Sequence, residues 1–436
     1  MSLLSPVPAP VEGLRIVTAK PRKAAFYFIL ITVVLDMLAL GIVIPVLPKL
    51  VETMVGGNTA TAASLYGWFG FTWAFMQFIC SPIIGALSDH FGRRPIVLMS
   101  NAGLGVDYLV MALAPSVGWL LIGRTISGMF AASISTAYAY ISDVTPVEQR
   151  AGRFGMMGAA FGVGFIVGPA LGGYLGAIDP RLPFWLAAGL SLLNALYGYF
   201  VLPESLPVEK RDGFRWSRAN PLAALRLLRS HAELFGLAGV LFLMNIAHFV
   251  LPSTMVLYAS YRYHWDERAV GLFLAGIGVF TIIVQGGLVR PAVKRFGERR
   301  AVLTGLMFGM AGFVVYGLAP TGQLLLIGIP VMALWGLTAP ALQGLMTERL
   351  NASDQGKLQG ANNSMMGIAG MIGPLLFTHV FAVAIRPGQA WHLPGAPMLL
   401  AALMMAFALA LAWRVAHKML AASVPLTAPE VVSAAL

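Results

Sequence analysis

Charged residues are scarce in this chain. Only 11% of its 436 residues are Asp, Glu, Lys or Arg, and the mean hydropathy is +0.79. A soluble protein needs roughly 25% charged residues to cover its surface. The scarcity therefore excludes a water-soluble globular protein.

Several chemical signatures are missing as well. Cys80 is the only cysteine, so no intrachain disulfide forms. A phosphate-binding Gly-x-x-x-x-Gly-Lys-Ser/Thr loop is absent, which leaves ATP hydrolysis without support. The sequence also lacks a metal-ligand cluster and a nucleophile elbow. We therefore expect neither an enzyme nor a protein with a metal or another cofactor. Residues 1–23 have no apolar core of a signal peptide and are predicted to be a cytoplasmic tail.

Long apolar runs are what the chain does contain, since 58% of its residues are hydrophobic. The runs are continuous rather than alternating, which favours helices that cross about 30 Å of hydrocarbon over the strands of a barrel. They predict an all-α membrane protein with twelve transmembrane helices. The expected spans are about 24–46, 64–87, 95–115, 117–141, 154–177, 183–203, 233–256, 269–290, 301–319, 322–345, 358–382 and 396–414.

The sequence repeats itself with an offset of 205 positions. Phe91-Gly92 returns as Phe296-Gly297, and Gly168-Pro169 returns as Gly373-Pro374. A constant offset over most of a half-chain indicates a duplication, and transporters are commonly built from two such halves. We expect two pseudo-symmetric six-helix bundles. The predicted parts are a tail at 1–23, a first half at 24–203, a cytoplasmic linker at 204–232, a second half at 233–414 and a tail at 415–436.

The net charge of +11 comes from cations concentrated on one side of the predicted membrane. With both termini inside, 23 of the 29 Lys and Arg residues fall in cytoplasmic segments and five on the opposite side. The bias of Lys and Arg toward cytoplasmic loops predicts this orientation, and it makes lipid rather than nucleic acid the partner. In the linker, Asn220-Pro221 begins a predicted amphipathic helix at the membrane surface.

The loop at 85–95 combines an acid, glycines and two arginines. Glycines permit a tight reversal between helix ends, and Asp89 can pair with a nearby arginine. We interpret the loop as a cytoplasmic latch that breaks when the halves move, although the arginines alone could serve only to set topology. Its members are Gly85, Asp89, Gly92, Arg93 and Arg94. The second copy replaces Gly85, Asp89 and Arg93 by Arg290, Lys294 and Glu298, so the latch belongs chiefly to the first half.

The fifth predicted span carries glycine every fourth residue from Gly164 to Gly176. This spacing places a bare ridge on one helix face, against which a neighbouring helix can pack closely. Gly168-Pro169 adds a possible kink. Two interpretations stay open: close packing alone, or a kink that serves a conformational change.

Ionisable residues within the predicted spans are few, and burying a charge in the bilayer costs several kcal/mol. We hypothesise that Asp36 or Asp107 exchanges protons and that Arg124 modulates one of them. The alternative is a fixed Asp–Arg pair that only tolerates burial. For His248 and His379 we favour satisfied polar contacts, because a lone histidine in a helix is more often that.

Uncharged polar residues in the spans are commoner than packing needs. Five of them are spread over both halves, as a shared central substrate site would require: Gln77, Asn245, Gln285, Gln343 and Asn362. The 25 Phe, 9 Trp and 22 Met residues suit an adaptable apolar pocket, and they suit contact with lipid equally well.

These motifs together resemble the major facilitator superfamily, in particular its tetracycline-type drug:proton antiporters. The resemblance covers nearly all of 24–414 and is strongest in the first half. It rests on Leu35-Asp36 with Gly41 and Pro45 to Pro48, Gln77-Phe78 with Ser81-Pro82, Gly85 to Pro95, Asp107-Tyr108, Gly123-Arg124, Ala139 to Asp143, Phe161 to Gly173, Leu342 to Gly344, Gln355 to Gly360 and Gly373 to Phe377.

The resemblance implies roles for several residues. Asp89 and Arg93 would form the cytoplasmic gate with Asp143 as a partner, and the essential membrane charges would be Asp36, Asp107 and Arg124. It implies proton-coupled efflux of a small amphiphilic drug across a bacterial cytoplasmic membrane by a protein that functions as a monomer.

Two positions depart from the pattern. Many tetracycline exporters carry a His in the eighth helix and an Asp in the ninth, where this chain has Thr281 and Gly309. An exporter of another drug or metabolite fits the sequence equally well. A nutrient uptake permease and a non-transporting membrane receptor of the same fold are the remaining alternatives.

Overall fold

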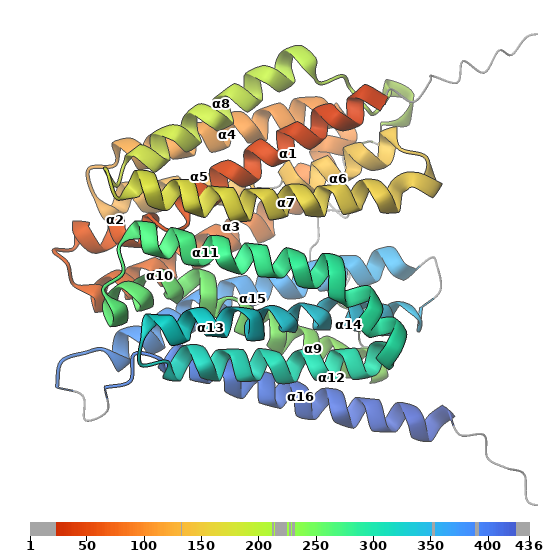
Figure 1. Ribbon diagram of the computed structural model, residues 1–436. Coiled ribbons are helices and arrows are strands. Elements are labelled where there is room, and N and C mark those ends of the chain that lie inside the picture. The colour runs from red at the N-terminus through yellow and green to blue at the C-terminus, as the bar shows by residue number, and fades with distance from the viewer. Residues whose placement is uncertain are drawn as a thin grey trace, which may run out of the picture.

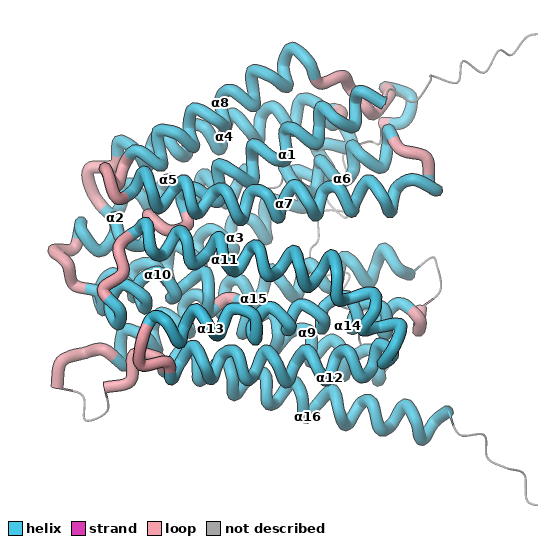
Figure 2. Tube along the Cα trace, viewed as in Figure 1, coloured by secondary structure: helices cyan, strands magenta, loops and turns pink. Residues whose placement is uncertain are grey.

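The computed structural model describes residues 23–131, 133–211, 213, 225, 228, 232–350, 354–388 and 392–423, and every regular element in these ranges is a helix (Figure 2). The first half contains α1 (Lys23–Val43), α2 (Leu47–Met54), α3 (Thr59–Phe91), α4 (Arg93–Leu113), α5 (Val117–Phe130), α6 (Ser133–Val144), α7 (Val147–Gly176) and α8 (Leu182–Val201). A short helix, η1 (Val208–Lys210), follows in the linker.

The second half repeats this series. It contains α9 (Ala232–His248), α10 (Val250–Tyr263), α11 (Glu267–Ile283), the π-helix η4 (Val284–Leu288), α12 (Val289–Leu318), α13 (Gly322–Ala333), the 3₁₀ helix η5 (Leu334–Leu337), α14 (Thr338–Thr347), α15 (Gln355–Ala384) and α16 (Ala396–Ser423). The predicted surface helix from Asn220 falls in 214–231, of which the structure describes only residues 225 and 228.

The predicted membrane spans are present among the described residues. Eleven helical stretches are long and apolar enough to cross a membrane, and one of them, Glu267–Leu318, is 52 residues long. This stretch turns back on itself at Gly297, whose φ of 78° is not helical, and therefore supplies two spans. In Figure 1, α11 runs toward one end of the bundle and α12 returns from it. The all-helical prediction of twelve spans is confirmed.

The duplication extends to the places where helices break. The first span is interrupted between Val43 and Leu47, and the seventh is interrupted at Phe249. The fourth span resumes at Ser133 and the tenth resumes its α-helix at Thr338, 205 positions later. Interruptions at matching positions of two halves are typical of transporters, whose substrate path runs beside such helices.

The glycine ridge of α7 packs closely on α1. A methyl group added at Gly168 would lie 2.6 Å from Cα of Gly41, and one added at Gly172 would collide with the backbone of Ile42. Helix α7 is continuous through Pro169. At its last turns α7 also meets the second half, because a methyl group at Gly173 would touch the backbone of Gly271 in α11.

The two halves lie against each other along α7 and α11 and along α3 and α15 (Figure 1). We call the end at which α1 begins and α16 ends the basic end, since the larger set of cations lies there, and we call the opposite end the joined end. At the joined end Lys49 Nζ donates to Ser260 Oγ of the other half at 2.7 Å. A hollow of about 1020 Å³, lined in part by these two residues and His392, opens there.

The halves separate toward the basic end. Methyl groups added to Gly152, Gly155 or Gly158 of α7 would meet nothing within 4 Å, and the same holds for Gly286 and Gly287 of η4 across the boundary. In the middle of the bundle the helices still touch, because a methyl group at Gly162 would lie 2.7 Å from Ile282. The two halves are therefore packed together at the joined end and diverge toward the basic end (Figure 1).

Candidate functional site

A buried polar cluster lies inside the first half. Asp36 of α1 is 6% exposed, and Asn194 of α8 donates through Nδ2 to Asp36 Oδ1 at 2.9 Å and to the carbonyl of Thr32 at 2.9 Å. Asn101 of α4, oriented so that its own amide nitrogen and oxygen both have partners, donates to the two Asp36 oxygens at 3.2 Å each. Three helices thus converge on one carboxylate.

Asp107 of α4 lies in a different environment within the same cluster. It is fully buried, and its carboxylate packs against Gly123 of α5, where a methyl group would lie 2.8 Å from Oδ1. Arg124 and Ser127 of α5 are its polar neighbours. Neither Asp107 oxygen accepts a hydrogen bond from a described residue. Arg124 thus lies close enough to attract the Asp107 carboxylate without a hydrogen bond to it.

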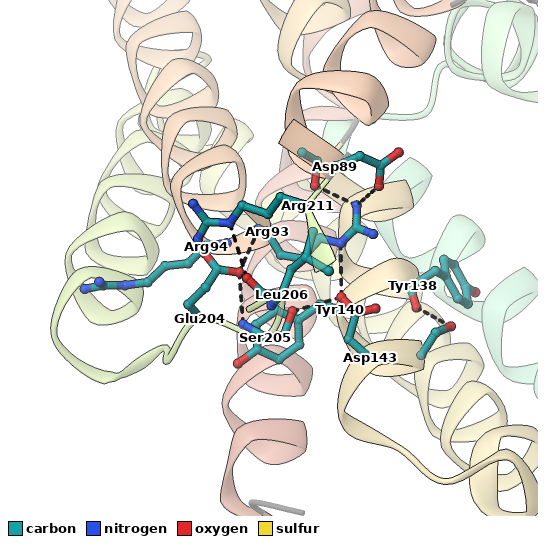
Figure 3. Close-up of polar contacts among 12 residues, drawn as sticks. Asp89, Arg93, Arg94, Tyr138, Tyr140, Asp143, Glu204, Ser205, Leu206 and Arg211 are labelled. Carbon is teal, nitrogen blue, oxygen red and sulfur yellow. Dashed lines mark hydrogen bonds and ion pairs between the residues drawn. The ribbon is translucent and has the colours of Figure 1, made fainter. Parts of the chain in front are cut away.

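Arg93 organises a second cluster at the basic end (Figure 3). Its Nη1 donates to Asp89 Oδ1 at 2.6 Å and to Ser88 Oγ at 3.1 Å, and its Nε donates to Asp143 Oδ2 at 3.1 Å. This Arg93 cluster joins the turn after α3 to the end of α6. All of these contacts lie within the first half.

Glu204, at the start of the linker, is a member of the Arg93 cluster that the sequence reading missed. Its carboxylate accepts from the backbone N–H groups of Arg93 at 2.9 Å and Arg94 at 3.2 Å, at the N-terminus of α4 (Figure 3). A carboxylate stabilises the exposed N–H groups and the positive dipole end of a helix. Ser205 Oγ then donates to Asp143 Oδ2 at 3.1 Å. The linker is therefore attached to the latch.

The glycines of the latch differ in what they do. Gly92 has φ 104° and ψ 163°, a backbone region that essentially only glycine adopts. A methyl group there would also lie 2.5 Å from Glu204 Oε2. Gly85 instead lies within α3, where a methyl group would meet nothing within 4 Å. The expected tight reversal depends on Gly92 and does not depend on Gly85.

The second copy of this turn keeps the backbone and changes the charges. Gly297, the counterpart of Gly92 in the sequence repeat, has a φ of 78°, so both glycines have a positive φ. Glu298 stands at the position that corresponds to Arg93, in the turn between two spans. Burial raises the pKa of Glu298, the charge of Glu348 raises it further, and Arg349 opposes the shift. A bridging arginine is therefore replaced here by a pair of neighbouring carboxylates.

The structure joins two of the five polar residues predicted to bind substrate. Asn362 of α15 donates through Nδ2 to Gln343 Oε1 of α14 at 2.7 Å. Gln285 is exposed in η4, and its side chain lies beside Gly336 at the break of the tenth span. Gln77 and Asn245 are partly exposed on α3 and α9 and hydrogen-bond to none of the other three. Gln77 follows Gly70 and Ala74 on the face of α3 that packs on α15.

His248 ends α9 at the break of the seventh span. Its ring lies 5.7 Å from that of Trp335, at the break of the tenth span. The side chain of His248 is exposed and has this indole as its aromatic neighbour across the two breaks. The sequence favours a satisfied polar contact for His248. In the structure, the contact of its ring is with the indole of Trp335.

The two departures from the antiporter pattern have local explanations. A methyl group at Gly309 would lie 2.9 Å from Cδ1 of Trp335, so the indole occupies the space that a larger side chain would need. Thr281 Oγ1 donates to the carbonyl of Ile277 at 2.8 Å, within its own helix. Neither residue contributes a charge to the interior of the second half.

A duplicated bundle of helices with carboxylates buried inside one half and polar side chains within the spans of both is the architecture of a secondary transporter. The sequence model described as Major Facilitator Superfamily matches residues 29–374. The chain belongs to this superfamily, and it is a multi-pass membrane transporter rather than an enzyme.

Among curated proteins, the tetracycline resistance proteins are similar to this chain. The class C protein of Escherichia coli is 37% identical over 369 residues, which cover 84% of this chain and 92% of that protein. The class G protein of Vibrio anguillarum is 36% identical over 370 residues, which cover 85% and 93%. The resemblance to this group of transporters is confirmed.

Solved structures share the fold. The human organic anion transporter MFSD10 (TETRAN) is 24% identical, with a TM-score of 0.66 over 90% of this chain and 99% of that one. A bacterial homologue of the human lysosomal transporter Spinster is 15% identical, with a TM-score of 0.74 over 93% and 98%.

Proposed function

We propose that this protein exports an amphiphilic drug of the tetracycline kind across the bacterial cytoplasmic membrane in exchange for protons. The observation that carries the proposal is the joined and open arrangement of the two halves. A path that is closed at one end and open at the other gives one of the two states that alternating access requires. The tetracycline resistance proteins to which the chain is similar supply the class of cargo.

The basic end faces the cytoplasm in this proposal. The split of 23 to 5 cations between the two sides supports this orientation, with both termini inside. The substrate enters from the cytoplasm or the inner leaflet through the open end, where Gln285 lies, and reaches the polar residues Gln77, Asn245, Gln343 and Asn362 along the boundary. Lys49 and Ser260 hold the outer end closed in this state.

The Arg93 cluster acts as the inner gate. Asp89, Arg93 and Asp143 brace α3, α4 and α6 as one unit, with Arg94 and Gly92 at the turn. Closure of the basic end brings this unit against the second half. Helices α7 and α1 move together during closure, because the ridge of α7 around Gly168 and Pro169 packs closely on α1. Protons are exchanged by one of the two membrane carboxylates, Asp36 or Asp107, in the neighbourhood of Arg124.

The test is transport in proteoliposomes that contain the purified monomeric protein. An imposed proton gradient is expected to drive accumulation of tetracycline in the opposite direction to proton flow. Expression in an efflux-deficient host is expected to raise tetracycline resistance. Flux that follows the proton direction would instead establish a nutrient uptake permease, and the absence of flux with every ligand would support a receptor.

The indole of Trp335, which packs against Gly309, favours a second class of cargo. Because the second half has no interior charge at Gly309 or Thr281, the cargo is expected to be a drug or metabolite whose binding needs an aromatic wall more than an anion. A susceptibility panel separates the two cargoes: resistance to other amphiphilic drugs without resistance to tetracycline identifies the second.

A further inference from the structure

The two carboxylates inside the first half have opposite surroundings. Asp36 receives hydrogen bonds from Asn194 at 2.9 Å and from Asn101 at 3.2 Å. Asp107 is more deeply buried, and neither of its oxygens accepts a hydrogen bond from a described residue. The amide NH₂ groups of Asn194 and Asn101 are hydrogen-bond donors, so they match the acceptor oxygens of a carboxylate at Asp36.

Amide donors and bare burial favour opposite protonation states. Hydrogen bonds donated to a carboxylate stabilise its ionised form, whereas burial without donors disfavours the charge. In this conformation the surroundings of Asp36 therefore fit a fixed anion. Those of Asp107 fit a carboxylic acid that holds a proton.

The other polar groups around the cluster are consistent with this division. Arg124 of α5 lies close enough to interact with Asp107, with Tyr66 of α3 and with Tyr108 of α4. Its guanidinium forms no hydrogen bond to either Asp107 oxygen. The hydroxyl of Ser127 of α5 lies near enough to interact with the Asp107 carboxylate, but it does not reach the geometry of a hydrogen bond to either oxygen. A small approach of α5 to α4 would bring Arg124 onto the Asp107 carboxylate and favour loss of the proton to water.

We propose that Asp107 carries the transported proton, while Asp36 is a permanent anion held in place by the positioning residues Asn194 and Asn101. This inference rests on the proposed proton-coupled export and assigns the coupling step to one of the two carboxylates. Asp107 takes a proton from outer water in one state and releases the same proton to inner water in the other. Asp36 binds α1 to α4 and α8 throughout the cycle, so these three helices move together.

Two amide substitutions separate the roles of the carboxylates. Wild-type protein, Asp107→Asn and Asp36→Asn are reconstituted and assayed with tetracycline, or with the drug that the wild type exports in the susceptibility panel. Two activities are measured: accumulation driven by a proton gradient, and drug–drug exchange without a gradient. Exchange needs both states of the protein but no net proton movement, so it reports whether a variant is folded and mobile.

Asp107→Asn is expected to lose proton-driven accumulation and to keep drug–drug exchange. Asp36→Asn is expected to keep proton-driven accumulation, at a reduced rate because the junction of three helices is weakened. Loss of proton drive in Asp36→Asn together with its retention in Asp107→Asn overturns the inference and leaves the proposed export intact. A wild-type protein that moves drug without any response to the proton gradient defeats the proposed coupling itself.

Asn194→Ala tests the positioning role, with Ser191→Ala as its matched control. Ser191 lies one turn earlier on α8, is 1% exposed, and its hydroxyl has no hydrogen-bond partner among the described residues. Without the Asn194 amide, Asp36 is expected to take up protons in the working pH range, so the pH profile of transport gains a second transition. The profile is expected to be unchanged in Ser191→Ala.

The double variant Asn194→Ala/Asp36→Asn completes the test. Removing the carboxylate that has lost its donor is expected to restore a single transition. An Asn194→Ala profile identical to that of the wild type, or a second transition that persists in the double variant, refutes the positioning role.

Discussion

At the scale of single residues, Gly92 is the most constrained position of the latch. Its φ of 104° and ψ of 163° are strained for any residue with a Cβ, at about 1–3 kcal/mol, and a methyl group would also press on Glu204. Gly92→Ala is expected to lower the thermal unfolding midpoint in detergent. Gly85→Ala, seven residues earlier in α3, is the control, and a gain of about 0.5–1 kcal/mol from higher helix propensity is expected there. Equal effects of the two variants would contradict this account.

The contribution of Glu298 to the stability of the folded protein is expected to depend on pH. Its folded-state pKa is raised by burial and by Glu348, so the folded protein binds this proton more tightly than the unfolded chain does. Stability from this group is therefore present at acidic pH and is lost as the pH rises from the ordinary glutamate range through the raised folded pKa. Relative to the wild type, Glu298→Gln is expected to gain stability as the pH rises, measured by thermal unfolding at pH 5 and pH 8. A constant difference between the two proteins would show that the carboxylate does not titrate in this way.

The sequence identified the residue types of the polar clusters better than it identified their partners. Asp89, Arg93 and Asp143 were expected together, and they meet around one guanidinium. Glu204 was not expected at the latch because 111 positions separate it from Arg93, and nothing local indicates that the linker folds back. In the same way, Asn194 was visible as a polar residue in a span, but its contact with Asp36 depends on how α8 packs on α1.

At the scale of the elements, the ridge of α7 is a packing surface whose tightness varies along its length. A methyl group at Gly172 would collide with the backbone of Ile42, which cannot yield as a side chain can. Gly172→Ala is therefore expected to destabilise the protein by about 1–3 kcal/mol, as overpacking typically does. Gly158→Ala, on the same helix where the surroundings are open, is the control and is expected to be neutral or stabilising. Thermal unfolding of both variants checks the contrast, and a destabilised Gly158→Ala would show that the open end is packed.

The spans were predictable and their breaks were not. Continuous apolar runs fix the number of crossings, since only about 20 residues reach across the hydrocarbon. The seventh span nevertheless breaks at Phe249, which is neither glycine nor proline. Phe249 packs against Gly370 and Gly373 of α15, so the break depends on a partner helix that periodicity cannot reveal.

At the scale of the whole molecule, the open and joined ends predict a pattern of solvent access. In a Cys80→Ser background, a cysteine at Gly155 is expected to react with a membrane-impermeant thiol reagent from the cytoplasmic side only. A cysteine at Thr53, beside the hollow at the joined end, is expected to react from the outside only. Labelling in right-side-out and inverted vesicles makes the measurement. The reverse pattern would invert the proposed orientation and leave the fold unchanged.

The turns at Gly92 and Gly297 have a consequence for how such a chain diverges after duplication. Both turns keep a glycine with positive φ, while the side chains around them have exchanged acids for bases. The backbone turn can therefore be retained while the charged side chains around it change. After the duplication, the second copy could gain a different set of charges, as at Glu298, with the same backbone turn.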